Sequence, residues 1–281
     1  MRPIGNISSR CSTGFNCVVE YWWAYPLLGA VVGFLAGLLG IGGGLQMVPV
    51  LTMIFKASGF PPQYIVHLAL GTSVATILLT SLASVRSHHR RGAVNWRIVR
   101  ELAPGIVLGT LMGAVVAGML DTLQLGILFT AFTFYVATRM LTGGTPNPRR
   151  ALPGPRGMFA AGTLIGGLSS FAAIGGAVLS VPFMLRRNVP MHEAVGTSAA
   201  IGFPIAATAT IGYVAMGWGL ALPAHSIGFV YLPAFAGIVV MTVLTAPLGA
   251  AIAHRTPGKR LRQIFALFLY ALAARMLASL L

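Results

Sequence analysis

Two glycine-rich segments are the residues of this sequence best suited to bind a ligand. The segment from Ile41 to Pro49 (IGGGLQMVP) is followed 133 residues later by the segment from Ile174 to Pro182 (IGGAVLSVP). Both lie inside apolar stretches, where glycine and proline interrupt a membrane helix only if other groups satisfy the freed backbone. A half-helix that starts inside the bilayer presents unpaired N–H groups and a partial positive charge. We therefore expect an anion site at two matching breaks, with backbone contacts from Gly42, Gly43, Gly44, Gly175 and Gly176.

Tight packing is the alternative explanation for these glycines, because small residues also line the interfaces between membrane helices. The doubling of the segment, each time followed by Val-Pro, favours a ligand site in addition to packing. A nucleotide-binding P-loop is excluded, since neither copy is followed by Gly-Lys and a hydroxyl residue.

Hydroxyl and amide side chains near the breaks supply further donors for a bound oxyanion. The triplet Gly-Thr-Ser at 71–73 recurs at 196–198, so the hydroxyls are doubled as well. The alternative for each hydroxyl is a bond to the backbone within the membrane. The side chains that we predict to contact substrate are Gln46, Thr72, Ser73, Ser169, Ser170, Thr197 and Ser198.

The ionisable groups at membrane depth are few. His67 matches His192 in the repeat, and Glu193 adjoins His192, so these three are a possible proton relay. A solvated helix end is the alternative for all three. The sequence has no acid/base pair, catalytic triad or Cys/His cluster, which predicts a protein that is not an enzyme, with no catalytic residue, no metal and no cofactor.

Composition places these segments in a membrane. The chain has 281 residues, 56% of them hydrophobic and 8% charged, with a mean hydropathy of +0.84. Soluble domains are about 25% charged, so we predict an all-α polytopic membrane protein. The net charge of +15 comes from basic residues in short loops, which indicates a positive-inside bias and not nucleic-acid binding. The expected partners are the lipid bilayer and a small anionic substrate, and the sequence leaves the oligomeric state open.

The chain divides into two repeats. A polar tail (1–21) precedes the first membrane repeat (22–142), and a proline-rich linker (143–156) leads to the second (157–281). The tail contains Cys11 and Cys17, which either pair outside the cell or are incidental thiols. Four short matches between the repeats occur in the same order along the chain. The apolar stretches fall at roughly 22–55, 65–85, 99–120, 123–142, 157–185, 193–215, 227–253 and 263–281.

Charge indicates how the halves are oriented. If every stretch crosses the membrane, the 19 basic residues divide 12 to seven between the two sides. If the glycine-broken stretches 22–55 and 157–185 enter and leave on one side, the division is 15 to four, which fits the positive-inside rule better. We therefore predict inverted repeats, each with one re-entrant segment and three transmembrane helices. The basic loops are then cytoplasmic and both termini lie outside.

The two motifs together resemble a known family. Two copies of the glycine segment, each followed by Gly-Thr-Ser, and the sequence HRRGAVNW at 89–96 are similar to the sulfite exporter TauE/SafE family, also called the toluene-sulfonate uptake permeases. The resemblance covers nearly the whole chain outside residues 1–21 and the linker. It implies a multi-pass carrier of the bacterial inner (plasma) membrane for sulfur-containing or small organic anions. The second copy departs from the glycine triplet at Ala173, Ile174 and Ala177.

The sequence predicts a transporter of a small anion such as sulfite, a sulfonate or a related organosulfur acid. Export is favoured, because an inside-negative potential expels anions without a coupling ion. The alternatives are an anion channel and a membrane scaffold or sensor subunit. A channel would pass anions too fast for alternating access, and a scaffold would show no substrate-dependent flux.

Overall fold

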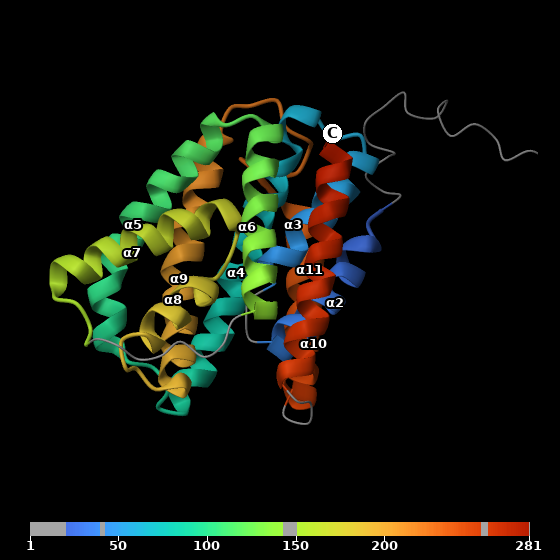
Figure 1. Cartoon of the computed structure of the whole chain (residues 1–281). Coiled ribbons are helices and arrows are strands. Elements are labelled where there is room, and N and C mark those ends of the chain that lie inside the picture. Colours follow the sequence, from blue (N-terminus) through green and yellow to red (C-terminus); the bar gives the residue numbers. More distant parts are fainter. Residues whose placement is uncertain (1–20, 40–42, 143–150, 254–257, 281) are drawn as a thin grey trace, which may run out of the picture.

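The computed structural model describes residues 21–39, 43–142, 151–253 and 258–280, which form a bundle of α-helices and one short β-hairpin (Figure 1). The prediction of an all-α polytopic membrane protein is confirmed for the helical content. In chain order the elements are α2 (Ala24–Leu39), α3 (Gly44–Ala57), η2 (Pro62–Tyr64), α4 (Ile65–Arg90), α5 (Trp96–Met119), α6 (Thr122–Thr142), α7 (Pro155–Ala172), α8 (Ala177–Leu185), α9 (Met191–Met216), β1 (Ser226–Ile227), β2 (Val230–Tyr231), α10 (Leu232–Ala253) and α11 (Gly258–Leu280).

Five of the described helical segments are long and apolar enough to cross a membrane. They are Pro62–Arg90, Trp96–Met119, Thr122–Thr142, Met191–Met216 and Gln263–Leu280. Apolar segments of 10–17 residues lie in α2, α3 and α10. The long segments coincide with the predicted stretches 65–85, 99–120, 123–142, 193–215 and 263–281.

The glycine segments end one helix and begin another, as the sequence predicts. In the first half, α2 is described to Leu39 and α3 begins at Gly44, while Gly42 lies outside the described residues. In the second half, α7 ends at Ala172 and α8 begins at Ala177. The linker 143–150 and the cysteines of the tail also lie outside the described residues.

Each broken stretch folds back on itself. The ring centroids of Tyr25, at the start of α2, and Phe55, near the end of α3, are 6.4 Å apart. Just after α8, the guanidinium of Arg187 donates from Nη1 to the carbonyl oxygen of Ala151, 3.2 Å away and just before α7. The outer ends of each pair of short helices therefore lie side by side, so α2 with α3, and α7 with α8, form two helical hairpins.

Helices of the two halves pack on each other in matching pairs. α2 of the first half packs along α10 of the second, and α7 of the second half packs along α5 of the first. Glycines permit the close contact, since a side chain on Gly109 of α5 or Gly162 of α7 would overlap the backbone of the facing helix. In Figure 1, α5, α7, α8 and α9 form one group and α2, α3, α10 and α11 another, with α4 and α6 between them.

Helices α4 and α9, which pack on each other, run antiparallel. The N-terminal part of α9 contacts Asn95, which follows the C-terminal end of α4. The N-terminal part of α4 contacts Tyr231 and Ala117, at the other end of the bundle. Basic residues gather at the Asn95 end, where Arg187 lies beside Ala151. Lys56 lies instead near the C-terminus, where it donates to the carbonyl of Ser279.

One difference from the sequence prediction lies at the start of the stretch 227–253. Its first residues form an antiparallel hairpin that pairs Ser226 with Tyr231 and Ile227 with Val230, and α10 begins only at Leu232. Gly228 makes the tight turn with φ of +52°, a conformation in which a Cβ is disfavoured. The sequence did not indicate this turn, because the strands of the hairpin and the helix that follows are both apolar.

Candidate functional site

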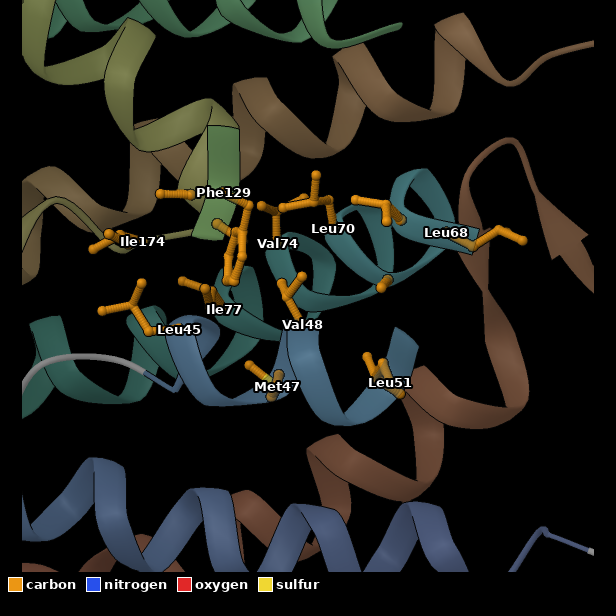
Figure 2. Close-up of a cluster of buried hydrophobic side chains, with 14 of the residues drawn as sticks. Leu45, Met47, Val48, Leu51, Leu68, Leu70, Val74, Ile77, Phe129 and Ile174 are labelled. Atoms are coloured by element: carbon orange, nitrogen blue, oxygen red, sulfur yellow. The ribbon is translucent and has the colours of Figure 1, made fainter. Parts of the chain in front are cut away.

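The two breaks meet in the interior of the bundle. A side chain on Gly44, the first residue of α3, would overlap the carbonyl oxygen of Ala173, the C-cap residue that follows α7. Figure 2 shows Leu45 from the first break and Ile174 from the second in one buried cluster with Ile77 of α4. Glycine at position 44 therefore lets the start of one half-helix touch the end of another.

The backbone of the second break is held in left-handed conformations. Gly176, which precedes α8, has φ of +81°, and Ala173 has φ of +47°. Residues other than glycine rarely adopt this region, so the alanine at 173 is strained. The N–H groups of Leu179 and Ser180 bond to the Gly176 carbonyl, which leaves the first N–H groups of α8 without acceptors in their own helix.

Several glycines of the breaks have close neighbours. Gly43 is buried against the side chain of Val32 in α2, so this glycine packs the first hairpin. The carbonyl oxygen of Gly175 touches Gly202 of α9, where an added Cβ would lie 2.7 Å from it. Packing, the alternative explanation for the glycines, is therefore part of their role, and anion binding by them stays a prediction.

Two serines of the Gly-Thr-Ser triplets have buried hydroxyls that lack a hydrogen-bond partner among the described residues: Ser73 and Ser198. Each lies one helical turn before a residue that contacts a break, since Ile77 touches Gly44 and Gly202 touches Gly175. Residues four apart on a helix are about 5–6 Å apart at Cβ. Both serines therefore lie about one helical turn from the breaks, and contact of their hydroxyls with a ligand stays a prediction.

Other unpartnered polar atoms lie on the helices that carry the breaks. Ser169 and Ser170, at the end of α7, and Ser180 of α8 are fully buried without a hydroxyl partner in the described structure. Gln46 donates through Nε2 to the carbonyl of Val32, 3.2 Å away, while its Oε1 has no described partner. Buried polar groups are normally paired, but unpaired hydroxyls also occur away from the breaks, as at Thr130, so contact of these side chains with a ligand stays a prediction.

The threonines of the two triplets hold the halves together. The hydroxyl of Thr72 accepts a hydrogen bond from the backbone N–H of Tyr231 at 3.0 Å, and that of Thr197 accepts from the N–H of Asn95 at 2.9 Å. The preceding glycines are in close contact as well, Gly71 with the carbonyl of Phe229 and Gly196 with that of Ala93. We call the Gly71–Thr72 contact the first joint and the Gly196–Thr197 contact the second joint.

Asn95 links α5 to α9 at the second joint, and our sequence reasoning did not select it as a functional residue. Its side-chain oxygen caps α5 by accepting from the N–H groups of Arg97 and Ile98, and its amide nitrogen lies 2.5 Å from Glu193 Oε1. The signal for the cap was present, because asparagine before an apolar helical run is a favoured N-cap. The partner lies 98 residues further on, which no local pattern reveals.

The structure does not bring the three relay residues together. The buried His67 ring donates from Nε2 to the carbonyl of Ala117 at 3.0 Å. Glu193 lies instead beside Asn95, at the opposite end of α5, and Ala117 follows Asn95 by 22 positions, about 33 Å along a helix. His192 is exposed at the same end as Glu193. No continuous path for protons through these three side chains is apparent.

The described part of the chain holds no group of three or more His, Cys, Asp or Glu side chains placed to bind a metal. Its buried polar side chains are Ser, Thr, Gln and His, with no buried carboxylate or ammonium group among the described residues. Neutral donors and helix N-termini, rather than charged side chains, surround the breaks. Such a site suits a small anion that exchanges its hydration shell for hydroxyl and N–H groups.

Comparison with known proteins agrees with these motifs. Residues 25–276 match the family described as Sulfite exporter TauE/SafE. The chain belongs to the TauE/SafE family. A probable membrane transporter protein of Haemophilus influenzae is 38% identical over 253 residues, which cover 89% of this chain and 96% of that protein.

More distant members of the TauE/SafE family occur in other organisms. A probable membrane transporter protein of Methanocaldococcus jannaschii is 27% identical over 86% of this chain and 91% of its own length. A probable membrane transporter protein of Bacillus subtilis is 28% identical over 68% of this chain and 77% of its own length. No solved structure matches the chain. The predicted family is confirmed, and the chain is a multi-pass membrane protein of a transporter family.

Proposed function

We propose that this TauE/SafE protein exports a small anion, such as sulfite, a sulfonate or a related organosulfur acid, across the inner membrane. The observation that carries the proposal is the meeting of the two breaks beside the unpartnered hydroxyls of Ser73 and Ser198. The half-helices α3 and α8 point their N-termini toward these breaks, and a helix N-terminus favours an anion. Gly42, Gln46, Ser169 and Ser170 complete the proposed site.

Two inverted repeats supply the mechanism of this proposal. The antiparallel course of α4 and α9, the hairpins at both breaks and the two matching joints support the inverted arrangement. Each hairpin is then a re-entrant segment, and the basic Asn95 end of the bundle faces the cytoplasm under the positive-inside rule. Movement of one half against the other exposes the central site to each side in turn.

The membrane potential is sufficient to drive export. Moving one negative charge out of an inside-negative cell gains about 2.3 kcal/mol per 100 mV, which corresponds to a concentration ratio of roughly 50. The absence of buried carboxylates among the described residues and the separation of His67 from Glu193 support a mechanism without proton coupling.

Flux of radiolabelled sulfite from proteoliposomes with an imposed potential tests the proposal. Ser73→Ala and Ser198→Ala should each weaken binding by about 1–3 kcal/mol, because each removes a donor to a charged oxygen. Thr130→Val is the control, since Thr130 has an equally buried and unpartnered hydroxyl on α6, a helix without a break or a joint. Unchanged affinity in both serine variants would place the anion elsewhere.

Orientation is tested separately by labelling single cysteines from outside intact cells. Arg91→Cys and Arg186→Cys replace exposed residues at the basic end and should resist a membrane-impermeant thiol reagent. Lys56→Cys and Arg275→Cys replace exposed residues on the side opposite in the predicted topology, and should react. Each variant is compared in a background in which Cys11 and Cys17 are replaced by serine. External labelling of Arg91→Cys would reverse the proposed orientation.

A further inference from the structure

An open groove lies outside the two breaks, at the basic end of the bundle. Its volume is about 660 Å³, and its walls come from α4, α5 and α9. Leu82 and Val99 line it from α4 and α5, and Phe203 from α9. The lining is almost entirely apolar, and Leu82 and Phe203 are 48% and 37% exposed, so the groove opens on the outer surface of the bundle.

Arg86 and His89, near the end of α4, and Trp96, the first residue of α5, also line the groove. They lie at its end nearest the loop between these helices, which we call the mouth, and Arg86 gives the mouth a positive charge. Trp96 donates through Nε1 to Nδ1 of His89 at 3.2 Å, and the two rings meet edge to face with centroids 5.5 Å apart. This pair fixes the indole as one wall, while Arg86 is exposed and has no ion-pair partner among the described residues.

The acids near the mouth are already engaged. Glu101 pairs with Arg97 at 3.0 Å, and Glu193 accepts from Asn95 at 2.5 Å. Arg90, Arg91 and Arg100 are exposed around the same end, without a carboxylate partner in the described structure. Asn95 is neutral and leaves the charge of Glu193 in place, but Arg86, Arg90, Arg91 and Arg100 outnumber it, so this end keeps a net positive charge.

The groove also has the depth of a membrane interface. Between Lys56 and Arg86 the sequence contains no Asp, Glu, Lys or Arg, so Arg86 is the first charged residue after a continuous uncharged span. Tryptophan is enriched at the same level of a bilayer, and arginine extends its charged group toward the headgroups. Apolar walls below a cationic mouth match a molecule with acyl chains and an anionic headgroup.

We propose that this groove binds one anionic phospholipid, with its acyl chain against Leu82 and Phe203 and its phosphate at Arg86. The site is separate from the breaks and does not depend on the transported substrate. A zwitterionic lipid of the same chain length fits the walls equally well, but its ammonium group is repelled by the arginines. The recognition is therefore by headgroup charge.

Quenching of Trp96 fluorescence by brominated lipids tests the proposal. The other tryptophans (Trp22, Trp23 and Trp218) are exposed and are replaced by phenylalanine, so Trp96 alone reports. The protein is reconstituted in phosphatidylcholine vesicles that contain equal mole fractions of either brominated phosphatidylglycerol or brominated phosphatidylcholine. We expect binding to favour phosphatidylglycerol by about fivefold, as one basic contact to an anionic headgroup provides.

Two variants and one competitor decide the outcome. Arg86→Gln should remove the preference, and the control Arg139→Gln, at an exposed position near the end of α6, should keep it. Ala83→Phe fills the groove from an exposed position and should reduce quenching by both lipids. Equal quenching by the two lipids in the unaltered groove would overturn the proposal. Loss of the preference for phosphatidylglycerol on addition of inorganic phosphate would also overturn it, because the mouth would then bind a free anion.

Discussion

At the first joint, the backbone N–H of Tyr231 reaches Thr72 within a cluster of aromatic rings, where Tyr231 meets Tyr25, Phe55 and Phe60. At the second joint, the N–H of Asn95 makes the same bond to Thr197, but the surroundings are the polar side chain of Glu193 and the basic loop. The backbone geometry is repeated, whereas the side chains around it differ. Water can reach the second joint more easily than the first.

Because of this difference, the two joints differ in the free energy that their opening costs. Aromatic rings exclude water by packing, so opening the first joint exposes a large apolar area. The second joint is held by hydrogen bonds that water can replace, each with a net value of about 0.5–1.5 kcal/mol. In the proposed cycle the basic end opens at the lower cost, and the aromatic end determines when the site is sealed from the opposite side.

Removal of the aromatic ring should have the largest effect. Tyr231→Ala deletes the side chain that contacts three other rings, and we expect the free energy of unfolding in detergent to fall by about 3–5 kcal/mol. Tyr231→Phe is the matched control, because the buried hydroxyl has no partner among the described residues. A loss in Tyr231→Phe as large as in Tyr231→Ala would mean that the hydroxyl, and not the ring, stabilises the first joint.

A methyl group at the glycine of each joint should have the next largest effect. Gly71→Ala and Gly196→Ala each place a Cβ on a carbonyl oxygen of the facing segment, and we expect each to destabilise the protein by about 1–3 kcal/mol. Gly167→Ala on α7 is the control, because its Cβ would make an ordinary contact at 3.5 Å. Thermal unfolding of the three variants measures the difference. Tolerance of alanine at position 71 or 196 would show that the joints are looser than the structure indicates.

Replacement of the threonines by valine keeps the shape and removes the acceptor. Thr72→Val leaves the N–H of Tyr231 unpaired in a buried place, at a cost of about 1–3 kcal/mol. Thr197→Val leaves the N–H of Asn95 unpaired where water has access, so its cost should be the smaller one. Hydrogen exchange at these two amides, compared with the unmodified protein, distinguishes the joints. A larger fall in opening free energy at Asn95 in Thr197→Val than at Tyr231 in Thr72→Val would contradict the comparison.

The smallest change should follow from Glu193→Gln. The amide oxygen of glutamine still accepts from Asn95, so we expect a loss of about 1 kcal/mol or less. Export down an anion gradient should stay within about twofold, since Glu193 lies far from His67 and carries no proton in the proposed mechanism. Proteoliposome flux with and without a pH gradient is the measurement. A pH-gradient requirement that disappears in this variant would make the protein a proton-linked carrier.

Local patterns predicted much of this architecture. Glycine and proline in an apolar stretch mark the ends of helices, and Gly44 and Ala177 do begin α3 and α8. The relation between distant residues could not be predicted in the same way. Thr197 and Asn95 are each unremarkable in sequence, and only the packing of α5 on α9 brings them together. The hairpin at Ser226–Tyr231 was missed because its apolar residues carry no helical or strand period.

The substrate side chains illustrate a second limit. Sequence repetition selected Thr72 and Ser73 equally, and their neighbours in space separate them. Thr72 accepts a backbone bond from the other half, whereas Ser73 has no described partner. Contact of either residue with the anion stays a prediction. Whether a hydroxyl has a hydrogen-bond partner depends on its neighbours in the opposite repeat. The sequence of one segment alone does not identify those neighbours.

The packing of helices of one half on helices of the other also affects the order of folding during synthesis. α2 packs on α10, yet Ala24 precedes Leu232 by 208 residues, so α2 enters the membrane long before its partner exists. At about 5–20 residues per second, a ribosome needs roughly 10–40 s to close that gap. During this interval the glycine face of α2 must be covered by lipid or by an insertion chaperone. The first half made alone would therefore remain an unfinished intermediate rather than a stable half-transporter.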